Sequence, residues 1–160
     1  WLYGESERSF IAKILAASAA GQSLRIVGDQ VGAPTSTRFL SQVTAGVAAR
    51  LIGGRASRPT RLRDILHVAC AGETSWYGFA KEVFVLAGQT GIRQPTIECV
   101  TSSSYPGVAL RPLNSRLDTS KLRNNYGIVV PDWKQELRAN LFAMHSARPA
   151  LVRSAHDARC

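Results

Sequence analysis

The stretch VGDQVGAPT, residues 27–35, joins a predicted strand to a predicted helix. Leu24 to Val27 has the short apolar pattern of a strand, and Thr35 or Ser36 is suited to begin a helix. Two glycines and a proline between them predict a loop at the helix N-terminus. Unpaired N–H groups at a helix N-terminus favour anions, so this loop is either an anion-binding site or a plain turn followed by a cap.

Helices and short strands alternate on both sides of this loop, which predicts an α/β protein. We expect helices from Ser9 to about Ala20, from Thr35 or Ser36 onward, from Thr74 or Ser75 to about Ala87, from Thr119 to Asn125 and from Asp132 onward, and strands at Leu24–Val27, Ile65–Ala69 and Ile97–Val100. The last helix begins with a capping-box pattern, and its expected docking residues are Trp133, Leu137, Leu141 and Phe142. Such few and short strands make a poor complete sheet but a good addition to a larger one.

A second loop, Arg111 to Asp118, is also expected to bind a ligand. Pro112 stiffens the backbone beside Arg111, and a guanidinium held in this way suits a phosphate or diphosphate. The alternative is an ordinary surface salt bridge. At the start of the chain, the indole of Trp1 is suited either to stack on a sugar or to fill the core.

Composition and charge exclude several classes of protein. The net charge is +9 and 16 of the 20 basic residues are arginines, several of them in the connector from Gly53 to Arg63. No nucleic-acid-binding motif accompanies them, so we expect no nucleic-acid partner. No apolar run approaches the ~20 residues that span a bilayer, and no leader is visible, so we expect a cytoplasmic protein with no membrane partner. The three cysteines, Cys70, Cys99 and Cys160, are expected to be free thiols.

The sequence contains no self-contained active site. It has no G-x-G-x-x-G motif, no P-loop and no serine-hydrolase elbow. The histidines His67, His145 and His156 are scattered, and His67 is expected to be a hydrogen-bonded core residue. Because the chain begins with Trp1 and not Met, we interpret it as a fragment, a processed chain or the product of a trimmed reading frame.

In combination these motifs resemble the dTDP-4-dehydrorhamnose reductase family of the extended short-chain dehydrogenase/reductase superfamily. The resemblance covers Trp1 to about Phe142 and rests on Trp1–Gly4, Ser9–Leu15, Val27–Thr35, His67–Ala69 with Gly72–Trp76, Arg111–Leu117 with Thr119 and Lys121, and Pro131–Trp133. The family has a Rossmann domain followed by a smaller substrate domain. The resemblance therefore implies that this chain is the C-terminal substrate-binding part, with residues 1–145 as that portion and 146–160 as a frayed tail.

The same resemblance implies an activity. In the family, NADPH or NADH reduces the C4 ketone of dTDP-4-dehydro-L-rhamnose to give dTDP-L-rhamnose, which supplies rhamnose for cell-surface polysaccharides such as the O-antigen of lipopolysaccharide. The resemblance places the glycine-rich cofactor loop and the catalytic Tyr-x-x-x-Lys pair in a missing N-terminal part, so we assign no catalytic or cofactor-binding residue here. The chain is expected to supply the sugar-nucleotide side and to be inactive alone. The alternative is a non-catalytic regulatory or binding module of the same superfamily.

What the resemblance carries over is a set of substrate-binding residues: Trp1, Gln30, Thr35, Arg111 and Asn114. Some relatives bridge a dimer through magnesium, using glutamates at the positions that Arg38 and Ala143 occupy in this chain. Neither residue is a magnesium ligand, so we expect no metal site of that kind. The expected partners are a dTDP-sugar and either a second copy of the chain or the N-terminal half.

Overall fold

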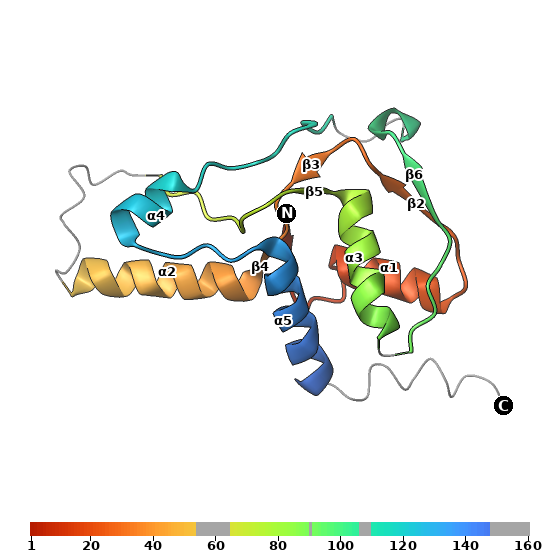
Figure 1. Ribbon diagram of the computed structural model, residues 1–160, viewed down its shortest axis with the longest axis horizontal. Helices are drawn as coiled ribbons and strands as arrows, with labels where there is room; N and C mark the ends of the chain where they lie inside the picture. The colour runs from red at the N-terminus through yellow and green to blue at the C-terminus, as the bar shows by residue number, and fades with distance from the viewer. Residues whose placement is uncertain (54–64, 90, 106–109, 148–160) are drawn as a thin grey trace.

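The computed structural model describes residues 1–53, 65–89, 91–105 and 110–147. Helices and short strand pairs alternate along the chain, which confirms the α/β class (Figure 1). The elements in chain order are β1 Leu2–Tyr3, α1 Phe10–Ala19, β2 Leu24–Val27, β3 Val31–Gly32, β4 Thr35–Ser36, α2 Thr37–Ile52, β5 Thr74–Ser75, α3 Trp76–Gly88, β6 Ile97–Val100, the single-turn 3-10 helix η1 Ser102–Ser104, α4 Ser120–Tyr126 and α5 Trp133–Ala147.

Three of the helices begin where their caps predict. Ser9, Ser36 and Ser75 stand directly before α1, α2 and α3, and each hydroxyl oxygen accepts a hydrogen bond from the backbone N–H three residues on. Such a cap stabilises a helix by about 1 kcal/mol, because it satisfies one of the unpaired N–H groups of the first turn. At the end of α4, Gly127 adopts a φ of +59°, a left-handed conformation that favours glycine.

The strands form three separate two-stranded pairs in the described part of the chain. β2 pairs with β6 in parallel from Leu24↔Ile97 to Val27↔Val100, at the bounds that the sequence predicts. β1 pairs with β4 in parallel, and β3 pairs with β5 in antiparallel orientation. The last two pairs have only two residues a strand, and the sequence predicts no strand at any of their four positions.

Two predictions about residues 65–69 are wrong. No regular strand forms there, and the first bridge beyond it joins Ala71 to Asp132. Ile65 is 75% exposed, whereas Ala69 is buried. Exposed and half-buried residues alternate over this segment, so it is not the strand buried on both faces that a nearly continuous apolar run indicates. His67 is exposed and is not a core residue.

The core lies around α3, which contributes the buried side chains of Phe79, Val83 and Phe84. Burying a side chain of this size contributes about 1.5–3 kcal/mol. Figure 1 shows α1, α3, β2 and β6 at one end of the molecule and α2 and α4 at the other, with α5 between them.

The helix α5 docks on this core through Trp133 and Leu137, which are buried, as predicted. Phe142 is 76% exposed, so little of its side chain is buried. At the start of the helix, Asp132 accepts a hydrogen bond from the backbone N–H of Lys134 through Oδ1. Most of the Gly53–Arg63 connector and most of the predicted 146–160 tail lie outside the described residues.

Candidate substrate-binding site

The two loops predicted to bind a ligand lie side by side. The backbone N–H of Val31 donates to the carbonyl of Leu113 at 2.7 Å, and the N–H of Ser115 donates to the carbonyl of Val31 at 2.8 Å. On its other side, Val31 pairs with Ser75 at the start of α3. The stretch 27–35 is therefore held between the arginine loop and the N-terminus of a helix.

Trp1 is packed against this junction. Its indole stacks on that of Trp76 with ring centroids 4.0 Å apart and an interplanar angle of 12°. Gly32 approaches the same indole so closely that a Cβ on Gly32 would lie 2.4 Å from Cε2 of Trp1. The carbonyl of Trp1 accepts a hydrogen bond from the N–H of Thr35 at 2.9 Å. Both the ring and the backbone of Trp1 are thus fixed by neighbouring elements.

A cavity of about 200 Å³ lies beside Trp1. Its lining is mainly apolar, with two hydroxyl side chains, and consists of Trp1, Leu2, Ala33, Thr35, Leu40, Val68, Ala69, Ser115 and Leu117. A concave, mainly apolar site with a few polar groups is typical of small-molecule binding. Residues from both predicted loops meet at this cavity. A hollow of similar size, about 220 Å³, lies along α2 and is lined by none of these residues.

The five predicted site residues differ in their surroundings. Gln30 and Thr35 are buried, Trp1 is half-buried, and Arg111 and Asn114 are exposed. The hydroxyl of Thr35 donates to the carbonyl of Ala33 at 3.0 Å and accepts from the backbone N–H of Cys70 at 3.1 Å. These two bonds use the hydroxyl within the fold, although the side chain also lines the cavity.

Asn114 is likewise engaged by its own loop. Its Oδ1 accepts hydrogen bonds from the backbone N–H and from Nε of Arg116, at 3.1 and 3.0 Å. The guanidinium of Arg116 in turn pairs with Glu73. These contacts fix the shape of the arginine loop, and they leave Arg111 as the exposed cation at its start.

One Tyr-x-x-x-Lys spacing does occur in the chain, at Tyr77 and Lys81. The expectation that the chain lacks this spacing is therefore wrong. Both residues lie on α3, where Lys81 Nζ is 5.6 Å from the centroid of the Tyr77 ring. The ammonium therefore makes a cation–π contact. The position also does not fit the family order, because the resemblance places the catalytic pair before Trp1 and Tyr77 follows the Gly72–Trp76 turn.

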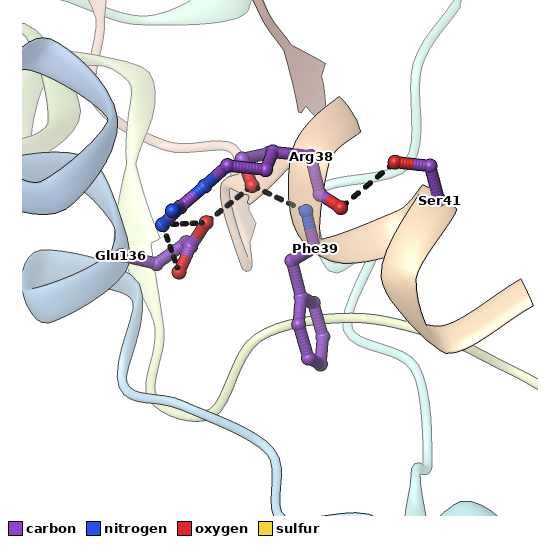
Figure 2. A network of polar contacts seen from close by, with 5 residues as sticks. Arg38, Phe39, Ser41 and Glu136 are labelled. Carbon is purple, nitrogen blue, oxygen red and sulfur yellow. Dashed lines mark hydrogen bonds and ion pairs between the residues drawn. The ribbon is translucent and has the colours of Figure 1, made fainter. Parts of the chain in front are cut away.

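A buried polar network behind the site is absent from the sequence predictions (Figure 2). Glu136 is only 7% exposed, and its Oε1 accepts a hydrogen bond from the hydroxyl of Ser36 at 2.5 Å. The guanidinium of Arg38 contacts both carboxylate oxygens, at 3.2 and 3.3 Å. Arg38, one of the two positions considered for magnesium, is thus paired with a carboxylate of the same chain. A signal for Glu136 exists in the sequence, because it shares one face of α5 with Trp133 and Leu137.

The network also influences its neighbours. Burial, with the negative charge of Glu136, raises the pKa of the Cys70 thiol to about 11. Burial raises the pKa of the Tyr3 hydroxyl too, and Cys70 and Glu136 add to that shift. Cys70 and Cys99 are free thiols, as predicted.

Within the described ranges, no three or more His, Cys, Asp or Glu side chains gather closely enough to hold a metal ion. Nor does any helix in that part of the chain combine the length and apolar character needed to cross a membrane.

The fold and the site together define an α/β substrate-binding domain, in which two loops from distant parts of the sequence meet beside a pair of stacked indoles. The chain belongs to the RmlD substrate binding domain family, whose model matches residues 1–146. This finding confirms the resemblance seen in the sequence.

Curated relatives support the assignment. The chain is 34% identical over 144 residues to a dTDP-4-dehydrorhamnose reductase of Sinorhizobium fredii, a match that covers 90% of this chain and 48% of the relative. It is 32% identical over 136 residues to the dTDP-4-dehydrorhamnose reductase of Escherichia coli K12, covering 84% of this chain and 44% of that relative. The chain therefore spans about half the length of the curated relatives it matches.

Solved structures agree. A dTDP-4-dehydrorhamnose reductase from Clostridium acetobutylicum matches with a TM-score of 0.73 and 30% identity, over 91% of this chain and 46% of that one. A second such reductase, from Bacillus anthracis in complex with NADP, has a TM-score of 0.75 and 24% identity, over 89% of this chain and 46% of that one. The match over less than half of each structure agrees with the predicted fold class, the substrate-binding part of an extended Rossmann-type reductase.

Proposed function

We propose that this chain is the sugar-nucleotide-binding part of a dTDP-4-dehydrorhamnose reductase. The complete enzyme would reduce dTDP-4-dehydro-L-rhamnose to dTDP-L-rhamnose with NADPH, as an extended short-chain dehydrogenase/reductase. Its product would supply cytoplasmic synthesis of cell-surface polysaccharides such as the O-antigen. Residues 1–145 would form the substrate-binding portion, and their expected partner is a dinucleotide-binding N-terminal half or a second copy of the chain.

One observation carries this proposal: the pairing of Val31 with the Leu113–Ser115 segment. It brings the loop that begins with the exposed Arg111 against the stretch 27–35 and beside the cavity at Trp1. An exposed cation at the start of a loop whose later residues line a small, mainly apolar cavity suits a ligand that joins a charged diphosphate to a deoxysugar or a base.

We assign the ligand contacts accordingly. The guanidinium of Arg111 would hold the diphosphate, while Trp1 and Thr35 would line the sugar side of the cavity. Gln30 and Asn114 would frame the two loops. NADPH does not fit the residues of this chain, because the sequence has no glycine-rich dinucleotide loop. Hydride transfer would depend on residues outside it.

The test is titration calorimetry with the purified chain. We expect dTDP-L-rhamnose to bind, and UDP-glucose to bind at least about tenfold more weakly. Equal affinity for both, or no heat with dTDP-L-rhamnose, would contradict the proposed function. Binding without turnover, after the chain is combined with the dinucleotide-binding half of the Sinorhizobium fredii relative, would favour the alternative of a non-catalytic binding module.

Arg111→Lys tests the assigned diphosphate contact. The substitution keeps the charge but removes the planar fork, so dTDP-L-rhamnose should bind about tenfold more weakly. Arg123→Lys is the matched control, because Arg123 is an exposed arginine on α4 outside both loops. Equal affinities of the two variants would assign the diphosphate to another residue.

A further inference from the structure

The indole of Trp1 is covered on both faces. Trp76 stacks on one face with ring centroids 4.0 Å apart. A Cβ built on Gly32 would lie 2.4 Å from Cε2 of Trp1, and 2.7 and 2.8 Å from the two ring atoms bonded to Cε2. Three such similar distances arise only when the approach is perpendicular to the ring plane, so Gly32 lies over the face that Trp76 leaves open.

A sandwiched indole has only its edge available to a ligand. Trp1 is half-buried and lines the cavity together with Thr35 and Ser115. A sugar ring cannot stack on either face without displacing Trp76 or the backbone of Gly32. The interpretation of Trp1 as a stacking platform for the sugar is therefore excluded by the packing, and its remaining role is to present an edge at a fixed angle.

We propose that Trp76 is a positioning residue, which holds Trp1 so that the edge of its indole forms one wall of the dTDP-sugar site. Trp76 begins α3 directly after the Ser75 cap, and Phe10 of α1 packs on it with ring centroids 4.8 Å apart. Trp76 is thus fixed by two helices, whereas Trp1 precedes a strand of only two residues. The inference rests on the proposed function, because it assigns Trp1 to a dTDP-sugar site.

Gly32 completes this arrangement from the opposite side. Its φ is not in the left-handed region, so an alanine there meets no backbone strain. The three atoms nearest to the added Cβ all belong to the Trp1 ring. Gly32→Ala should therefore displace Trp1 while leaving Trp76 in place. It tests the position of Trp1 independently of any change to Trp76.

The experiment compares Trp76→Leu, Trp76→Phe and Gly32→Ala in the full chain, with dTDP-L-rhamnose as the probe in calorimetry. Circular dichroism near 230 nm reports the exciton couplet of two stacked indoles. Tyr77→Leu is the matched control, because it removes the next aromatic of α3 without touching the stacked pair.

We expect Trp76→Leu and Gly32→Ala to lose the couplet and to weaken dTDP-L-rhamnose binding about tenfold, the upper range for one aromatic pair. Trp76→Phe should also lose the couplet but restore binding to within about threefold, since a ring still covers Trp1. Tyr77→Leu should keep both signals.

Three results would overturn the inference. The first is unchanged affinity in Trp76→Leu, and the second is a Trp76→Phe variant as weak as Trp76→Leu. The third is a Gly32→Ala variant that binds dTDP-L-rhamnose as tightly as the unsubstituted chain. If the unsubstituted chain shows the couplet but binds no dTDP-L-rhamnose, the proposed function fails and the inference falls with it. Binding that is equal in all variants refutes the inference and leaves the proposed function standing.

Discussion

The network around Glu136 allows two interactions with one carboxylate to be ranked by their free energies. The hydroxyl of Ser36 donates to Glu136 at 2.5 Å where both side chains are buried. Arg38 reaches the same carboxylate at 3.2 and 3.3 Å, but its side chain is 44% exposed (Figure 2). A buried hydrogen bond to a charged group contributes about 1.5–3 kcal/mol. An ion pair that shares its charge with solvent contributes about 0.2–1 kcal/mol. The neutral hydroxyl should therefore stabilise the fold more than the formal salt bridge does.

Double-mutant cycles measure this ranking. Ser36→Ala, Arg38→Ala and Glu136→Ala would be combined in pairs, and the free energy of unfolding measured in urea by tryptophan fluorescence. We expect a coupling of about 2 kcal/mol between Ser36 and Glu136, and less than about 1 kcal/mol between Arg38 and Glu136. Ser36→Ala also removes the cap of α2, but this cost is the same whether residue 136 is Glu or Ala, so it cancels in the coupling free energy.

Salt separates the two couplings further. At about 1 M salt the screening length falls to ~3 Å, so the Arg38 coupling should nearly vanish while the Ser36 coupling remains. Glu136→Gln should cost less than Glu136→Ala, since a neutral acceptor still faces Ser36. An Arg38 coupling equal to or larger than that of Ser36 would refute the reasoning, and so would a Ser36 coupling that disappears in salt.

Three other measurements follow from the sequence and the structure. The chain mixed with NADPH and dTDP-4-dehydro-L-rhamnose should show no oxidation of the nicotinamide, and turnover above the blank would disprove its dependence on a second part. In a Cys160→Ser variant, a thiol reagent at pH 8 should label the exposed Cys99 and not the buried Cys70. With a pKa of about 11, only about one Cys70 thiol in a thousand is ionised at that pH. Equal labelling of the two cysteines would contradict the buried network. Hydrogen bonds from Ser102 lower the pKa of Asp29 from 3.8, so that their stabilisation is present above pH 3.8 and is lost as the pH falls through the lower folded value. Ser102→Ala should raise the pKa of Asp29 in an NMR titration, and an unchanged value would assign the shift to another cause.

Local chemistry explains why much of the fold is predictable from the sequence. The hydroxyls of Ser9, Ser36 and Ser75 each accept a hydrogen bond from the N–H three residues on. The start of each helix is therefore determined by residues within its first turn. The parallel pair β2–β6 is predictable at the level of its strands, because Leu24–Val27 and Ile97–Val100 each have a recognisable apolar pattern.

Pairings of two residues leave no such pattern. β1–β4 and β3–β5 are defined by partners far along the chain, and a two-residue strand has no periodicity to detect. At residues 65–69 the error is the reverse, because a strand was predicted there and none forms. The apolar run has the pattern of a strand, but no neighbouring strand pairs with it along its length. Glu136 was missed because a helical glutamate is ordinarily solvated, and its burial depends on Ser36 and Arg38 from a distant segment.

The stretch 27–35 is one of the segments on which the family resemblance rests, yet its side chains and backbone mostly serve the fold itself. Asp29 binds Ser102 beyond the end of β6, Gly32 leaves room for the indole of Trp1, and the Thr35 hydroxyl joins Ala33 to Cys70. Each of these requirements would remain if the ligand changed, because none of them involves a group outside the chain. A match to this stretch therefore indicates how the site is folded. Which ligand binds depends on the groups that this fold leaves exposed. Under the proposed function, Arg111 and the edge of Trp1 would be the first of these groups that a change of nucleotide sugar affects.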